Sequence, residues 1–272
     1  MIGEGVFFGL SCSIKYPCNL LDAPYSIIAS GTLLPPQRIS FPFSLISSHE
    51  HSNFNILYPG WVLLHSPYTI VRNNDKYKRR WLRGRGESVG SRHEFDGPIF
   101  RREIIDCVLR SISFIEICLE KILSKLEDET ENTDENAYII DSVYLEGVGI
   151  CKTNLKMLKK GLKGYKDLVK MYALEGYLEQ QRLEVSEHKE DGKESQDRVS
   201  SYSQHKISLF NSIDGLSEQS HDECVDQFQQ LQKTFNDRVI SCRSKDFERA
   251  KDIFGEEIDI LKYDEIIDNL TK

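Results

Sequence analysis

The sequence predicts an α+β protein in which short β-helix-like coils at the N-terminal end are capped by a mainly α-helical body. Two observations support this prediction. Aliphatic residues recur at every sixth position over residues 21–45, and two long stretches farther along the chain have the i, i+3, i+4 pattern of amphipathic helices. With 272 residues, of which 39% are hydrophobic, the chain has enough apolar material for one large domain or two small ones.

The six-residue period appears in two series of residues. One consists of Leu21, Ile27, Leu33, Ile39 and Leu45, and the other, in an offset phase, of Phe8, Ile14 and Leu20. A period of six fits neither an α-helix nor a single long strand. It suits a parallel β-helix, in which each short strand sends one aliphatic side chain into the core. An irregular β-meander with coincidental spacing is the alternative.

An apolar and aromatic stretch over residues 54–71 follows these coils. It is broken by Pro59-Gly60 and by Ser66-Pro67, which is typical of a packed transition between strands and helices. Repeat architectures need such a cap over their open end. We therefore assign Trp61 and Tyr68 to the core of the cap and not to a ligand platform.

The second half of the chain alternates between helical and polar segments. Residues 105–126 predict a helix, 127–136 an acidic loop, 137–146 a strand and 154–181 a second long helix. Residues 184–206 are polar, and two further helices are expected over 224–242 and, capped by Ser244, over 245–254, with one more possible in the tail. The resulting segments are 1–71, 72–182, a polar linker over 183–206, and 207–272.

Composition and charge favour a cytoplasmic protein that binds neither membranes nor nucleic acids through its whole surface. The net charge is −8, no stretch of 18 apolar residues is present, and the first ten residues lack a basic leader. Seven cysteines without a close paired motif suit reduced thiols. We expect no cofactor and no metal, since His49 and His51 lack a third ligand nearby.

Residues 72–102 concentrate positive charge, with ten basic and four acidic residues. Guanidinium groups match phosphate and carboxylate oxygens, so the segment is a candidate anion site. The alternative is that these arginines pair with the protein's own acidic segments, such as residues 127–135. The candidate anion-binding residues are those nearest the end of the apolar stretch, namely Arg72, Asn73, Lys76, Arg79 and Arg80. No nucleophile or general base can be named, so an enzymatic activity stays open.

Several strings resemble the C-terminal part of uncharacterised bacterial proteins that carry a left-handed β-helix of hexapeptide repeats, a family known as a domain of unknown function. The strings are GEGVFFGL (3–10), FPFSLI (41–46), YPGWVL (58–63) and YTIVRNNDKYKRR (68–80). The family's motif ARN-x-x-K-aromatic-x-x-R falls on Arg72, Asn73, Lys76, Tyr77 and Arg80, with Val71 in place of its alanine. The resemblance covers about residues 1–180 and implies left-handed coils, of which the family has many more.

Two functions follow as hypotheses. The first is a transferase-like protein that binds or modifies a sugar phosphate or nucleotide sugar, because left-handed β-helices often serve acyl transfer or sugar-nucleotide metabolism. The alternative is a non-enzymatic scaffold that stacks its β-helix end on a partner or a second copy. A third possibility, RNA binding through the aromatic residues Tyr77, Trp81 and Phe95, is disfavoured by the acidic net charge.

Overall fold

The computed structural model describes residues 1–49, 54–73, 99–128, 138–139, 151–187 and 201–254, and it confirms the α+β class. The chain forms two compact units. The first unit comprises Met1–Gly60 and Phe100–Gln232, and the second comprises Trp61–Ile99 and Lys233–Lys272. Each unit thus combines stretches that the sequence analysis assigned to separate segments.

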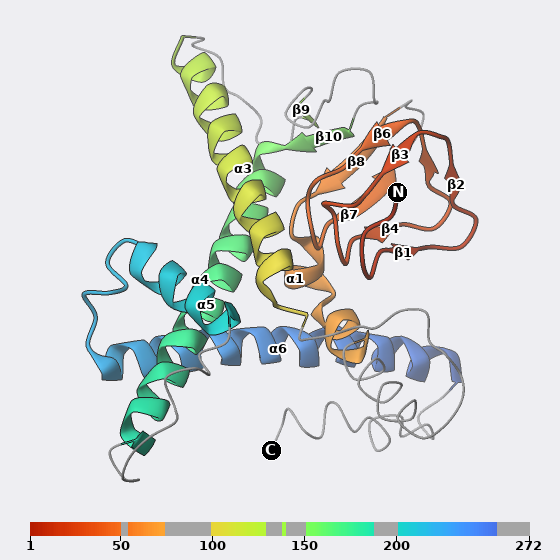
Figure 1. Cartoon of the computed structure of the whole chain (residues 1–272). Coiled ribbons are helices and arrows are strands. Elements are labelled where there is room, and N and C mark those ends of the chain that lie inside the picture. Colours follow the sequence, from red (N-terminus) through yellow and green to blue (C-terminus); the bar gives the residue numbers. More distant parts are fainter. Residues whose placement is uncertain (50–53, 74–98, 129–137, 140–150, 188–200, 255–272) are drawn as a thin grey trace, which may run out of the picture. The chain divides into compact units, whose positions relative to one another are not determined.

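Short parallel strands build the N-terminal part of the first unit (Figure 1). The first coil, residues 1–20, contains β1 (Phe7–Phe8), β2 (Ser13–Ile14) and β3 (Cys18–Asn19). The second coil, residues 21–40, contains β4 (Ile27–Ile28), β5 (Leu33–Leu34) and β6 (Gln37–Arg38). Each strand of the first coil pairs in parallel with its counterpart in the second, with registers Phe7↔Ile27, Ser13↔Leu33 and Cys18↔Gln37. The two coils therefore stack along three separate sheets.

A left-handed backbone conformation recurs in the two coils and in the segment that follows them. Gly5, Tyr25 and Phe43 have φ values of 65°, 57° and 54°. This conformation disfavours L side chains by roughly 1–2 kcal/mol per residue. Stacking offsets part of that cost, because the rings of Tyr25 and Phe43 lie 5.5 Å apart at an interplanar angle of 8°. A Cβ on Gly5 would lie 2.3 Å from the Tyr25 ring, so this corner requires glycine.

The predicted six-residue series is inward-pointing only in part, since Leu20 and Ile39 of the series are fully buried but other inward aliphatic residues lie outside it. Ile28, Leu34 and Ile46 are fully buried, whereas Leu21 and Leu33 are 47% and 45% exposed. The predicted phase was therefore wrong at these positions, although Ile39 of the same series is buried. The physical reason is that the strands carry two adjacent aliphatic residues, and sequence spacing alone does not determine which of the two faces the core.

A mixed sheet continues from the coils. Strand β7 (Leu45–Ser48) pairs in parallel with β4, and β8 (Asn55–Tyr58) runs antiparallel to β7. Strand β10 (Cys151–Asn154) joins β8 in parallel, and β9 (Tyr138–Ile139) closes the order β1-β4-β7-β8-β10-β9. The strand predicted over 137–146 is present at Tyr138–Ile139, and residues 140–150 lie outside the described part of the chain.

The helices of the first unit match the two strongest periodic stretches of the sequence. They are α3 (Arg102–Asp128) and α4 (Leu155–Glu187), which pack against each other, while α5 (Ser201–Ser212) packs on α4 (Figure 1). Buried Ala173, Leu174, Phe210 and Cys224 form the core between α4, α5 and the first part of α6 (His221–Phe254). None of the described helices is long and apolar enough to cross a membrane.

Two sequence expectations about these helices need correction. The polar linker expected over 183–206 is helical at both ends, because α4 continues to Glu187 and α5 begins at Ser201. The two helices expected over 224–254 are one helix, α6. Ser244 does not cap a new helix, since its hydroxyl donates a hydrogen bond of 2.9 Å to the Ile240 carbonyl one turn earlier. The further helix considered for the tail lies outside the described residues.

Tyr165 of α4 anchors the helix to the strands. Its hydroxyl donates to the Pro42 carbonyl at 2.6 Å and accepts from the Gly60 amide at 3.0 Å. Burial raises the pKa of Tyr165, so the phenol remains a donor. Beside it, a Cβ on Gly161 would lie 2.5 Å from the Pro59 carbonyl oxygen. The absence of a side chain at this position lets the backbone of α4 approach Pro59 closely.

Tyr165→Phe is expected to lower the free energy of unfolding by about 1–3 kcal/mol, because it leaves the Pro42 carbonyl and the Gly60 amide buried without their partner. Urea denaturation followed by circular dichroism measures the change. Tyr177→Phe on the same helix is the matched control, because no hydrogen bond of its hydroxyl occurs in the described structure. Equal losses in the two variants would contradict the anchoring role of Tyr165.

Glu4 joins the first coil to the start of α3. Arg101 donates from Nη1 to Glu4 Oε1 at 3.1 Å and from Nη2 to Oε2, and the Tyr25 hydroxyl also donates to Glu4. Burial by itself raises the pKa of Glu4, but the hydrogen bonds from Arg101 and Tyr25 and the charge of Arg101 outweigh it and hold the pKa below its ordinary value of 4.5.

A carboxylate whose pKa is lowered by folding stabilises the fold above its unfolded pKa and ceases to do so as the pH falls through its folded pKa. We therefore expect the wild-type melting temperature to fall more steeply than that of Glu4→Gln as the pH decreases from about 5 to about 3. Differential scanning fluorimetry across this range measures both slopes. Parallel curves would show that Glu4 contributes no pH-dependent stability.

Candidate functional site

The described part of the second unit consists of two helical stretches held by a small apolar core. The first stretch contains α1 (Trp61–His65) and a helical segment over residues 67–73, separated at Ser66 before Pro67. The second is the part of α6 from residue 233. Buried Tyr68 and Val239 meet between them, supported by Val71, Phe235, Ile240 and Cys242. Tyr68 is therefore a core residue, as its position in the aromatic stretch predicted.

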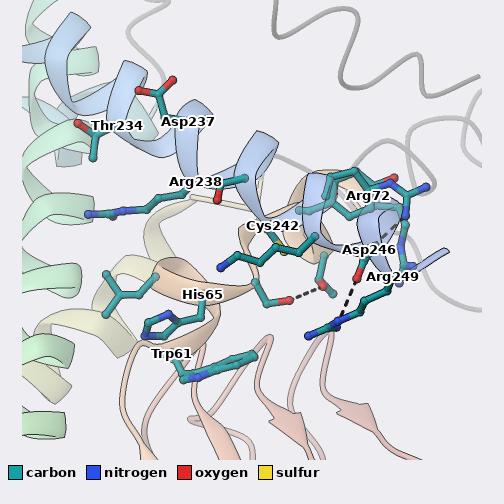
Figure 2. A pocket seen from close by; sticks show the side chains of 16 residues that line it. Trp61, His65, Arg72, Thr234, Asp237, Arg238, Cys242, Asp246 and Arg249 are labelled. Carbon is teal, nitrogen blue, oxygen red and sulfur yellow. Dashed lines mark hydrogen bonds and ion pairs between the residues drawn. The ribbon is translucent and has the colours of Figure 1, made fainter. Parts of the chain in front are cut away.

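A pocket of about 720 Å³ lies between these two stretches. On one side it is lined at positions three to four residues apart, by Trp61, Leu64, His65, Tyr68, Thr69 and Arg72. On the other side the same spacing appears along α6, at Thr234, Asp237, Arg238, Ser241, Cys242, Lys245, Asp246 and Arg249. Residues at this spacing share one face of a helix, so the lining residues of α6 lie along one side of that helix. Figure 2 shows side chains of both stretches around the pocket.

Positive charge predominates in the lining. Five residues are cationic, namely Arg72, Arg238, Arg243, Lys245 and Arg249, and two are acidic, Asp237 and Asp246. Asp246 is shared between Arg243 and Arg249, at 3.7 and 3.9 Å. Within the described residues, Arg72, Arg238 and Lys245 form no ion pair with an acidic side chain. The pocket therefore has more cationic groups than its own carboxylates can neutralise.

Aromatic rings accompany these charges. The guanidinium of Arg243 lies 4.8 Å from the ring centre of Tyr68 and 4.5 Å from that of Phe247, which fixes its position. Trp61 and His65 line the pocket with ring centres 5.7 Å apart (Figure 2). Trp61 is half-buried and faces the pocket, so its assignment to the core of the cap needs correction. Its ring can stack on a sugar or a base beside bound phosphate.

The structure brings one of the five candidate anion-binding residues into this pocket. Arg72 is exposed and lines it, and Asn73 follows at the end of the same helical segment without lining it. Lys76, Arg79 and Arg80 lie outside the described residues. The α6 residues of the lining were not predicted, although Arg238, Lys245 and Arg249 stand seven and four residues apart, which places them on one helix face.

Two other arginines of the basic segment pair with the protein's own acids. Arg101 binds Glu4, and Arg102 lies 3.8 Å from Asp106. The alternative interpretation of the segment therefore holds for these two residues, although their partners differ from the acidic segment 127–135. Among the described residues no group of three His, Cys, Asp or Glu side chains could hold a metal ion.

Comparisons with known proteins give little functional information. No protein-family model and no solved structure matches the chain. An uncharacterized protein of Treponema pallidum (strain Nichols) is 31% identical over 78 residues, which cover 29% of this chain and 10% of that protein. The similarity thus spans a tenth of the relative's length. The resemblance to hexapeptide-repeat proteins stays a prediction.

Proposed function

We propose that this protein binds a phosphate-bearing small molecule, of the sugar-phosphate or nucleotide-sugar class, in the cationic pocket of the second unit. The observation that carries the proposal is the excess of five cationic over two acidic side chains around one pocket. Arginine offers forked donors that match two phosphate oxygens at once. Arg72 and Arg238 are available for this role because neither is paired with an acidic side chain of the described chain.

The size and composition of the pocket support the same class of ligand. Small-molecule sites commonly enclose about 300–1,000 Å³, and this pocket of about 720 Å³ falls within that range. The ring of Trp61 gives a sugar or nucleobase a surface on which to stack, while phosphate groups would contact Arg72, Arg238 and Lys245. A neutral ligand would offer no negative charge to pair with these cationic side chains.

The proposal also includes the fold of the two N-terminal coils. We propose that the two coils form a short β-helix, supported by their parallel pairing along three sheets and by left-handed corners at Gly5 and Tyr25. A transferase-like role follows from the use of this fold in sugar-nucleotide metabolism, which is an analogy of fold. Binding of the ligand is the part of the proposal that the pocket itself supports.

Thermal unfolding with candidate ligands tests the proposal. The probes are a uridine diphosphate sugar, a hexose phosphate, coenzyme A and inorganic phosphate, with the uncharged hexose as control. A ligand at about one hundred times its dissociation constant stabilises the folded state by about 2.7 kcal/mol. We expect stabilisation by phosphate-bearing probes, weakening as salt increases. The absence of stabilisation by every phosphate-bearing probe would contradict the proposal.

A further inference from the structure

One face of α4 is lined with lysines. Between residues 155 and 174 the helix contains six lysines and a single acidic residue, Asp167. Successive residues of an α-helix are about 100° apart, so the six lysines lie within an arc of about 120°, opposite the buried Leu158 and Tyr165. At about 1.5 Å per residue this face is about 21 Å long. We call it the lysine stripe and define it by Lys156, Lys159, Lys160, Lys163, Lys166 and Lys170.

The lysine stripe faces solvent, and the described chain neutralises little of its charge. Its first five members are exposed and Lys170 is half-buried. One ion pair is formed by Lys166, whose Nζ lies 2.6 Å from Oε1 of Glu116 on α3. Four members form no ion pair with any carboxylate of the described residues, namely Lys156, Lys160, Lys163 and Lys170. In a chain of net charge −8, this face is a local concentration of positive charge.

The stripe weakens the helix that carries it. Like charges three or four residues apart on a helix repel each other, as Lys156 and Lys160 do. The helix follows Asn154, whose side chain accepts a hydrogen bond of 2.8 Å from the Met157 amide, and its first turn contains no acidic residue. Cations near a helix N-terminus oppose the helix dipole. Such departures from local preference are typical of functional sites, which indicates a binding surface.

The composition of the lysine stripe favours an acidic peptide over other polyanions. No large hydrophobic side chain is exposed between Lys156 and Lys170, so this face offers no ring for stacking on nucleic-acid bases and no apolar anchor for a bilayer. It also has no arginine to bind phosphate through paired hydrogen bonds. The stripe follows one helix, whereas each strand of a nucleic-acid duplex winds around its axis. An extended peptide is straight, and about six residues span this length.

We propose that the lysine stripe binds an extended acidic segment of a partner protein. The carboxylates of that segment lie beside the ammonium groups and reduce the repulsion among them. Lysine suits this role because its ammonium is a point charge on a flexible stem, which pairs with carboxylates in many geometries. The surface belongs to the first unit, and its function is independent of anion binding in the second unit.

Fluorescence anisotropy with a labelled glutamate peptide of about ten residues tests the proposal. The full chain should bind this peptide, more weakly as salt rises from about 0.05 to about 0.2 M, and should not bind a glutamine peptide of equal length. The double variant Lys160→Glu, Lys163→Glu should weaken binding at least about tenfold, because attraction becomes repulsion at two positions. The matched control is Lys15→Glu with Lys233→Glu, which changes the net charge equally at exposed lysines outside the stripe and should retain the affinity.

A stability measurement separates this role from a structural one. Lys160→Gln relieves repulsion on the helix, so its melting temperature should be no lower than that of the wild type. Four results would each overturn the proposal: a lower melting temperature of Lys160→Gln, no binding of the glutamate peptide, equal effects of the two double variants, or tighter binding of a short DNA duplex or of phosphatidylserine vesicles than of the peptide.

Discussion

Replacing Arg238 with alanine is expected to weaken the binding of a uridine diphosphate sugar about tenfold to a hundredfold. Hydrogen bonds to charged groups contribute about 1.5–3 kcal/mol each, and 1.4 kcal/mol corresponds to a factor of ten in affinity. Arg238 lines the pocket with no ion pair to a described carboxylate, so the variant removes a proposed ligand contact without breaking an ion pair among the described residues. The same reasoning predicts a comparable loss for Arg72→Ala. Titration calorimetry measures both.

Two further variants make this prediction specific to the pocket. Arg182→Ala removes an exposed arginine on α4 and should leave the affinity unchanged. Asp237→Asn removes one of the two acidic groups of the lining and should strengthen binding, since it takes away a repulsive charge. If Arg238→Ala binds the probe as well as Arg182→Ala does, the pocket is not the binding site.

Phe43→Ala is expected to cost about 3–5 kcal/mol of unfolding free energy, the usual range for a buried phenylalanine. Phe43 is fully buried, with Tyr25 stacked on one side at 5.5 Å and the ring of Phe100 at 6.0 Å. Its backbone stays in the left-handed conformation, so alanine retains the strain without the stacking that offsets it. Urea denaturation provides the measurement.

Phe114→Ala serves as the control for this loss. Phe114 contacts Phe41 at a ring distance of 5.7 Å but is 41% exposed, so its truncation should cost much less. In addition, Phe43→Gly should be no less stable than Phe43→Ala, because glycine tolerates a positive φ. A similar cost for Phe43→Ala and Phe114→Ala would show that the stacked rings of Tyr25 and Phe43 do not contribute more to the unfolding free energy than a partly exposed ring does.

Local pattern accounts for what could be predicted of the fold. The helices α3 and α4 follow from their apolar periodicity, and the close approach at Gly161 follows from a glycine that a free helix would disfavour. The sequence does not show which residue of an adjacent aliphatic pair faces the core. Residues such as Leu33 and Leu34 are chemically equal, and only the tertiary fold turns one of them inward. The left-handed corner at Phe43 gives no signal in the sequence.

The candidate site was predictable on one side only. Arg72 could be singled out because it follows directly from an apolar stretch. Arg238, Lys245 and Arg249 belong to a helix more than 160 residues later in the chain, and nothing local indicates that this helix faces Arg72. Their common helix face was the one available signal. That α6 and the stretch around Arg72 line the same pocket could be learned only from the fold, because the contact of distant segments is a tertiary property.

A crystal structure of the protein in complex with a uridine diphosphate sugar is the most direct test of anion binding in the second unit. We expect phosphate density within hydrogen-bond distance of the guanidinium group of Arg72 or of Arg238, with the sugar or base against the ring of Trp61. A saturating ligand bound elsewhere on the chain, with this pocket filled by water alone, would contradict it.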